Sequence, residues 1–348
     1  MRNFIKELIA CPSPSGYEEQ CMGVFKKYCS EFATPFFEDK IGNVVYSIGT
    51  GSKKILLSGH IDELGLQVIS IGKDGKLSVI PLGGIDKKIL PGSKVLVETE
   101  NQGWIVGVIG KKPIHAETPD DRNSVSKLSD LTVDLGYSSD EDIKKLGIEI
   151  GSFIVYDRNL GDLDFGDGKQ ILAPGLDDKL GVLVAAEIGK ILASDSKFLA
   201  DYQILIAATV QEEVGLRGAT VLSQLLKPDI SIDFDVTPSS DYGVNTKEWG
   251  DLSVGKGPVI EIGPDKNKRL VRLLKETAKN HEIPYQLTVT GRPGGTNTDV
   301  IQLFGGNCET AHLALAIKNL HTPVEICSWD DVENSVKLVT ELVKTGKL

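Results

Sequence analysis

Two histidines and several carboxylates stand at or just past the ends of apolar segments in this sequence. The segments are KKILLSG, QILIAATV, DISIDFDV and TAHLALAI, and each has the length and composition of a buried strand. One further acidic pair lies between a loop and an apolar helical segment, in APGLDDKLGV. The side chains in question are those of His60, Asp177, Asp178, Glu212, Glu213, Asp235 and His321.

Their shared position in the sequence indicates one chemistry. In an open parallel sheet, ligands bind just beyond the carboxyl ends of the strands, so side chains placed there converge on one edge. Imidazole nitrogens and carboxylate oxygens together suit zinc, cobalt and manganese. The sequence therefore predicts a divalent-metal site built from two imidazoles and at least three carboxylates.

Each of these residues also has a plainer interpretation. A single histidine at a strand end is commonly a hydrogen-bonded structural residue. Asp177 or Asp178 could cap the helix that follows, and Asp178 is the better candidate for that role. Glu212 and Glu213 could form a solvated turn, although they stand between an apolar strand and the glycines of VGLRGA. Taken together, the residues favour the metal site.

The elements that must position these residues alternate between helix and strand. Residues 1–30 have helical periodicity, and Ser328 with Asp331 three residues later gives a capping signal for the last helix. This alternation predicts an α/β fold with a doubly wound, largely parallel sheet. Strands are expected at 43–48, 54–58, 202–210, 229–236, 259–262, 285–290 and 311–317, and helices at 178–193, 218–226, 267–281, 299–304 and 329–343.

A β-rich segment interrupts this pattern. Short runs rich in Val and Ile, separated by Gly or Asp turns, predict a small barrel or sandwich with one short helix at 140–146. The chain is thus expected to form a discontinuous catalytic domain, residues 1–66 and 164–348, and an all-β insert, residues 67–163. The six expected strands of the insert are 67–71, 76–82, 94–98, 104–109, 131–137 and 153–156.

Composition narrows the classes of function. The chain of 348 residues carries a formal charge of -11, which disfavours nucleic acid and anionic membranes as partners. Its five cysteines show no C-x-x-C spacing, so we expect free thiols and a reducing, cytoplasmic environment. The N-terminal segment has charges inside its apolar stretch and does not resemble a signal peptide.

Several motifs together resemble one known family. HIDELGLQV, PLGGIDKKIL, GVIGKKPIH, LDDKLGV, QEEVGLRGA, DVT, GGTNTD and LHTPVE occur in this order over nearly the whole chain. They resemble the glutamyl aminopeptidase/cellulase-M family of dinuclear metallo-aminopeptidases, several of which form tetrahedral particles of twelve subunits. QEEVGLRGA and HTPVE are the most specific of these motifs.

The resemblance implies a role for each matching residue. It implies two divalent ions, zinc, cobalt or manganese, with Asp177 as the ligand that bridges them. Glu212 matches the general base, which would take a proton from water and pass it to the leaving amine. Asp62 matches the acid that orients the first histidine ligand. Asp233 is a rival to Asp235, but the Asp-Val-Thr match favours Asp235. The implied metal ligands are His60, Asp177, Glu213, Asp235 and His321.

The resemblance also implies peptide substrates and a homo-oligomer, a tetrahedral dodecamer with dimers as intermediates, assembled through the insert. Three alternatives stay open. One is another amide hydrolase on the same scaffold, a deacylase or a carboxypeptidase. A second is a glycosidase, because part of the family carries a cellulase label; however, glycosidases generally use two carboxylates without metal. The third is a non-catalytic binding protein, which the presence of Glu212 disfavours.

Several residues outside the predicted metal site are expected to have mainly structural or contact roles. His115 in the insert is expected to have a structural or interface role. His281 is expected at a helix end on the surface, and His312 is expected to pack within its strand. Arg217 is expected in a buried ion pair or against substrate. Asn297 in GGTNTD departs from the Asp of many relatives and bears on contacts with the substrate amine or a loop. Three tryptophans are expected to be packing residues and not a cage for a ligand: Trp104, Trp249 and Trp329.

Overall fold

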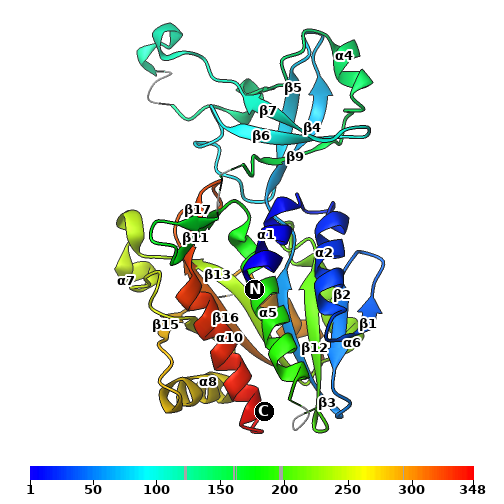
Figure 1. The fold of residues 1–348 in the computed structure, drawn as a ribbon. Helices are drawn as coiled ribbons and strands as arrows, with labels where there is room; N and C mark the ends of the chain where they lie inside the picture. Colours follow the sequence, from blue (N-terminus) through cyan, green and yellow to red (C-terminus); the bar gives the residue numbers. More distant parts are fainter. Residues whose placement is uncertain (121–123, 160, 162, 196–198, 293) are drawn as a thin grey trace.

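The computed structural model describes residues 1–120, 124–159, 161, 163–195, 199–292 and 294–348. Figure 1 shows two stacked parts, a mixed α/β domain that carries both termini and a smaller β barrel above it. The chain enters the barrel after His60 and leaves it before Asp177, so both connections run beside the predicted site. The fold class expected from the sequence is confirmed.

An eight-stranded sheet forms the centre of the larger part. Its four central strands are parallel, and antiparallel strands adjoin them on both sides. The inner strands are almost completely buried, because helices cover both faces, and their sequences are correspondingly near-continuous apolar runs. The spatial order is β1 (Thr34–Glu38), β2 (Val44–Ile48), β12 (Tyr202–Thr209), β3 (Lys53–His60), β13 (Ile230–Pro238), β16 (Glu309–Ile317), β14 (Val259–Ile262) and β15 (Gln286–Val289).

Helices pack on the two faces of this sheet. The helix α5 (Leu176–Ala193) is buried nearly all round, as its sequence LGVLVAAEIG requires, and lies against β3 and β13. The same core contains side chains of α1 (Arg2–Ala10), α2 (Glu19–Cys29), α8 (Lys268–Asn280) and α10 (Trp329–Lys344). The opposite face is covered by α6 (Arg217–Leu226) and α9 (Asn297–Phe304), whose apolar side chains form a separate core.

The insert is a closed six-stranded antiparallel barrel with its own apolar core. Ser139 caps its helix α4 (Asp140–Lys145) by accepting the N–H of Asp142. The strand expected at 131–137 is much shorter than predicted and comprises only Val133–Asp134. The barrel strands, in order, are β4 (Gly65–Ile71), β5 (Leu77–Leu82), β8 (Val133–Asp134), β7 (Gly103–Ile109), β6 (Lys94–Thr99) and β9 (Phe153–Tyr156).

Several elements were not predicted. The edge strand β1 escaped notice because its side chains are mostly exposed and carry no apolar alternation. A three-stranded sheet was missed because its strands are too short to show a period: β10 (Asp164–Phe165), β11 (Gln170–Ala173) and β17 (Glu325–Ser328). This small sheet matters for the site, since β11 precedes Asp177 and β17 begins four residues after His321.

The capping signal of the last helix is half right. Ser328 accepts the N–H of Asp330 and caps α10. Asp331 takes no part in this cap. Its carboxylate accepts the N–H groups of Gly255 and Gly257 and so holds a loop against the helix.

Within the described residues, no helix is both long and apolar enough to cross a bilayer.

Candidate metal centre

Three predicted ligands from separate elements meet at the carboxyl edge of the sheet. His60 ends β3, Asp235 lies near the end of β13, and Asp177 lies in the first turn of α5. One donor atom from each lies within 4.8 Å of the others. His60 Nε2 lies 3.1 Å from Asp177 Oδ1 and 3.9 Å from Asp235 Oδ1. All three side chains are buried, so their donor atoms face one another rather than water.

A second group of three shares Asp177 with the first. Donor atoms of Asp177, Glu213 and His321 also lie within 4.8 Å of one another. His321 Nε2 lies 3.2 Å from Asp177 Oδ2, while Oδ1 of the same carboxylate faces His60. The two oxygens of Asp177 therefore face two different donor groups, which is the arrangement of a bridging carboxylate between two cations.

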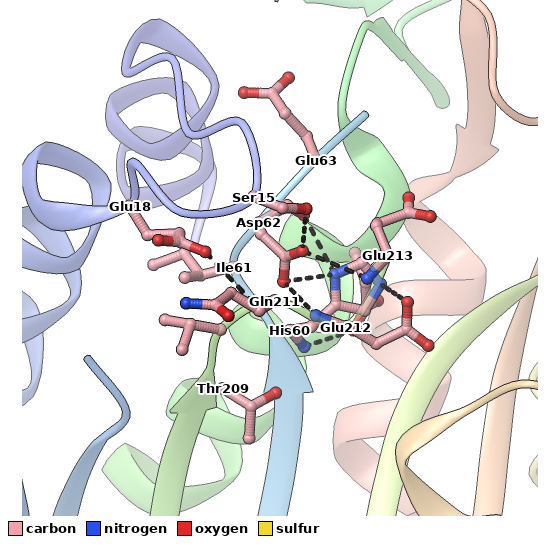
Figure 2. Close-up of polar contacts among 12 residues, drawn as sticks. Ser15, Glu18, His60, Ile61, Asp62, Glu63, Thr209, Gln211, Glu212 and Glu213 are labelled. Carbon is pink, nitrogen blue, oxygen red and sulfur yellow. Dashed lines mark hydrogen bonds and ion pairs between the residues drawn. The ribbon is translucent and has the colours of Figure 1, made fainter. Parts of the chain in front are cut away.

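Asp62 connects the first group to the turn that carries the glutamates (Figure 2). Its carboxylate accepts the backbone N–H groups of Glu212 and Glu213 and the hydroxyl of Ser15. His60 Nδ1 lies 3.5 Å from Asp62 Oδ1 and 3.0 Å from the Asp62 carbonyl oxygen. Asp62 thus holds the ring of His60 with its Nε2 toward the other ligands, and fixes the turn of the glutamates at the same time.

The electrostatics show a surplus of buried negative charge. Burial raises the pKa of Glu212 to about 10 and that of Asp235 to about 7, and nearby carboxylates add to both effects. Burial likewise raises the pKa of Glu213 well above its usual range. Asp177 is the exception, because hydrogen bonds from His321 and His60 outweigh its burial and lower its pKa.

These residues fit a pair of divalent ions. The donors are imidazole nitrogens and carboxylate oxygens, the set preferred by zinc, cobalt and manganese. Glu213 Oε1 is buried and has no hydrogen-bond partner among the described residues, which leaves it open for a cation. Positive charge at the site would also offset the burial that raises the pKa values of Glu213 and Asp235.

Glu325 is part of the site and was not predicted, although it is the last residue of the LHTPVE motif. It is fully enclosed, and burial, with Asp177 nearby, raises its pKa to about 8. Its carboxylate accepts the N–H groups of Leu176 and Asp177 through Oε2, and that of His321 through Oε1. One side chain thus sets the backbone of two ligands that are far apart in the sequence.

Two backbone positions beside the site lie in the left-handed region. Gln211 has φ 54° and His321 has φ 63°, a conformation that costs non-glycine residues on the order of 1 kcal/mol or more. A buried carboxylate accepts the N–H of each, Glu18 Oε1 for Gln211 and Glu325 Oε1 for His321. The turn before Glu212 and the loop at His321 are therefore both held by acceptors from other elements.

Asp178 and Asp233 have other partners. Asp178 is fully buried and accepts the N–H groups of His60 and Gly181, the second of which is the local helix contact expected for it. Asp233 accepts the Ser58 hydroxyl at 2.6 Å and lies in a third donor group, with Asp235 and His312. Asn297 donates to the hydroxyl of Thr209 and, at 3.4 Å, to Asp233.

Three other residues differ at least in part from the predictions. Arg217 is exposed and donates to the Val214 carbonyl oxygen, so the predicted buried ion pair is wrong, and a contact with substrate stays a prediction. Trp249 is 57% exposed and lines the cavity beside the two donor groups instead of serving as a packing residue. His312 lies within a strand as expected, but its Nδ1 contacts Glu261 Oε2 at 2.6 Å, which is more than packing.

The remaining residues lie in the following surroundings. His115 is exposed in the short turn Ile114–Ala116 of the insert, and its role at an interface stays a prediction. His281 follows the end of α8 and pairs with Glu341 at 3.5 Å. Trp329 is buried and stacks with Arg2, and Trp104 packs edge-on against Tyr17.

The two donor groups open into a cavity of about 650 Å³. The side chains of both donor groups and of Glu212 line this cavity. Its other walls come from β13, β14 and β16, from residues 288–292 and 294–296, and from Trp249. A cavity of this size accommodates one or a few amino-acid residues beside the donor groups.

Comparison with known proteins places this architecture in one family. A sequence model of the M42 glutamyl aminopeptidase family matches residues 42–338. The lysyl aminopeptidase of Pyrococcus furiosus is 33% identical over 349 residues, which cover 99% of this chain and 96% of that protein. The structure of a TET aminopeptidase from a marine sediment archaeon of the Thaumarchaeota superposes with a TM-score of 0.91 at 30% identity and covers 98% of this chain and 96% of that one.

A further solved structure is that of the Pyrococcus horikoshii TET1 peptidase, described as able to assemble into a tetrahedron or a large octahedral shell. It superposes with a TM-score of 0.85 at 33% identity and covers 98% of both chains. The fold and the site define a metal-dependent aminopeptidase. The chain belongs to the M42 glutamyl aminopeptidase family.

Proposed function

We propose that this protein removes N-terminal residues from peptides at a dinuclear metal centre. The observation that carries the proposal is the position of Asp177, whose two carboxylate oxygens face two separate donor groups. His60 and Asp235 complete one group, and Glu213 and His321 complete the other. Zinc, cobalt or manganese suits both sets of donors.

Bound divalent ions supply a Lewis acid for the scissile carbonyl and lower the pKa of water. The residues of the chain do the rest. Glu212 is the general base: its Oε2 lies 3.8 Å from His60 Nε2, so the carboxylate borders the donor groups. It takes the proton of the attacking water and delivers it to the leaving amine nitrogen. Asp62 fixes the backbone of Glu212 and the ring of His60, which keeps the base in place.

Exopeptidase specificity separates this proposal from its alternatives. A panel of aminoacyl anilides with free amines should be hydrolysed, whereas the same anilides with acetylated amines should not. Preference for the acetylated amino acid itself would indicate a deacylase, and release of C-terminal residues would indicate a carboxypeptidase. Hydrolysis of cellulose oligomers after removal of metal would indicate a glycosidase. The panel also reveals which N-terminal residue is preferred.

We further infer a homo-oligomer, with a tetrahedral dodecamer as the expected form and dimers as intermediates. The similar structures include peptidases described as dodecameric or as able to form a tetrahedron. Apolar side chains on the outside of the barrel support this inference, among them Val106, at 52% exposure, and Ile150, at 69%. A hollow particle would admit peptides and exclude folded proteins. All five cysteines are free, which is consistent with a cytoplasmic location.

A further inference from the structure

Four polar side chains form a row across neighbouring strands beside the metal centre. Ser58 on β3 is the register partner of Asp233 on β13, and Asp233 is the partner of His312 on β16. The antiparallel pairing of β14 with β16 brings Glu261 opposite His312, where their side chains contact. The row is therefore a product of sheet register, and Asp235, two residues after Asp233, lies on the same face of β13.

The Nδ1 atom of His312 has a hydrogen-bond partner, the carboxylate of Glu261. This nitrogen lies 2.6 Å from Glu261 Oε2, and Lys266 Nζ lies 2.9 Å from the same oxygen. His312 is 3% exposed and Glu261 5%, so this contact is shielded from water. A carboxylate that accepts Nδ1–H leaves Nε2 with a lone pair, and this is the arrangement typical of metal-binding histidines.

Two further atoms of this row lack a hydrogen-bond partner among the described residues. They are His312 Nε2 and Asp233 Oδ2, and both are buried. One donor atom from each of Asp233, Asp235 and His312 lies within 4.8 Å of the other two. An imidazolium would donate its Nε2–H to a carboxylate here, and the described residues contain no such bond. Converging buried lone pairs repel one another unless positive charge lies between them, and a divalent cation bound by all three residues would supply that charge.

We propose that Asp233, Asp235 and His312 form a third divalent-cation site. It adjoins the dinuclear centre, shares Asp235 with it, and takes an ion that accepts one nitrogen and carboxylate oxygens, such as zinc, manganese or cobalt. Asp235 and His312 line the cavity of about 650 Å³, so an ion reaches the site from solvent. The site goes beyond the proposed function, which needs only the two donor groups around Asp177.

The test is the metal content of the full-length oligomer. The protein is stripped with a chelator, reloaded with excess manganese or zinc, separated from free metal and examined by elemental analysis. Wild type should hold one more ion per chain than His312→Gln, and the same loss is expected for Asp233→Asn, which keeps the size of the side chain. His281→Gln is the matched control, since it removes a histidine from the surface and should lose no ion.

Anomalous diffraction at the metal edge locates each ion in crystals of the reloaded wild type. A peak between Asp233, Asp235 and His312 supports the proposal, and it does so even if a variant fails to fold. Absence of that peak, with equal metal content in wild type and in Asp233→Asn, overturns it and leaves a proton on His312 as the positive charge. Absence of peaks around Asp177 would instead contradict the dinuclear centre, so the two failures are distinguishable.

Discussion

Asp177 and Asp178 are neighbours in the chain, but their side chains have different partners and therefore different expected roles. Asp177 faces both histidines, whereas Asp178 accepts two backbone N–H groups. We expect Asp177→Ala to release metal from both donor groups, because it removes the shared ligand. Asp178→Ala should retain more metal and lower thermal stability, because it leaves the buried N–H of His60 unpaired. Elemental analysis and melting curves measure the two effects.

The outcome that reverses this assignment is loss of metal from Asp178→Ala alone. Equal loss from both variants would contradict the special position of Asp177.

Glu212 is the residue on which the rate of hydrolysis should depend most. Glu212→Gln keeps the size of the side chain but removes the base, so kcat should fall by roughly 10²–10⁴-fold. The variant should keep its metal, because Glu212 belongs to neither three-residue donor group around Asp177. Steady-state kinetics with an aminoacyl anilide, together with metal analysis, checks both statements. A near-native kcat would exclude Glu212 as the base. Loss of metal would show that Glu212 is a metal ligand and would make Glu213 the candidate base.

Individual site residues could be predicted where a polar side chain follows a long apolar run. Residues that act through contacts with the backbone could not. His60 and Asp235 are visible because a polar side chain closes a buried strand. Glu325 gave no such signal: its carboxylate binds N–H groups at 176, 177 and 321, and pairing between residues so far apart cannot be read from spacing. His312 was underrated because its partner, Glu261, lies on a different strand.

At the scale of elements, a buried ion cluster links the two connections of the barrel to helix α5 of the α/β part. Glu63 lies where the chain enters the barrel, and Arg158 lies where it leaves. Both Arg158 and Lys179 of α5 pair with the Glu63 carboxylate, and all three side chains are at most 7% exposed. Burial alone would raise the pKa of Glu63, but these two cations outweigh it and lower the pKa to about 2.

This cluster predicts a pH-dependent loss of stability. The folded pKa of Glu63 lies below its ordinary value of 4.5, so its contribution is complete above that value and is lost as the pH falls toward 2. Glu63→Gln should therefore cost about 3 kcal/mol near neutral pH, since two buried cations lose their partner. The gap between the melting temperatures of wild type and variant should narrow between these two pH values.

The exposed Glu149, replaced by Gln, serves as the control and should leave the pH profile unchanged. A Glu63→Gln variant as stable as wild type at neutral pH would show that the cluster does not stabilise the protein.

The helices and long strands were predictable because their apolar periodicity or continuous burial leaves a clear pattern. Strand 153–156 and strand 259–262 were predicted with the bounds that the structure has. The strands of the small sheet β10–β11–β17 were not, because two to four residues carry no period. Tertiary contacts, not local propensity, make these segments strands.

At the scale of the whole molecule, the barrel is the expected site of assembly. Val106 and Val108 point outward from the same face of β7 and are 52% and 44% exposed. Changing both to Glu should leave the fold intact and give smaller particles, because charges would oppose burial of this face against another subunit. Replacement of residues 67–163 by a short Gly/Ser linker should also give smaller species, with weakened activity.

Light scattering of the intact protein at micromolar concentration measures the outcome. A monomeric wild type that keeps its activity on dilution would contradict the assembly and leave the metal chemistry untouched.

The central claim is that hydrolysis depends on divalent ions held around Asp177. The most direct measurement follows the activity on a free aminoacyl anilide and the metal content of the same sample during dialysis against a chelator. Activity should disappear as the ions around Asp177 are removed and return when zinc, cobalt or manganese is added back. Full activity in a sample verified to be free of metal would contradict the claim.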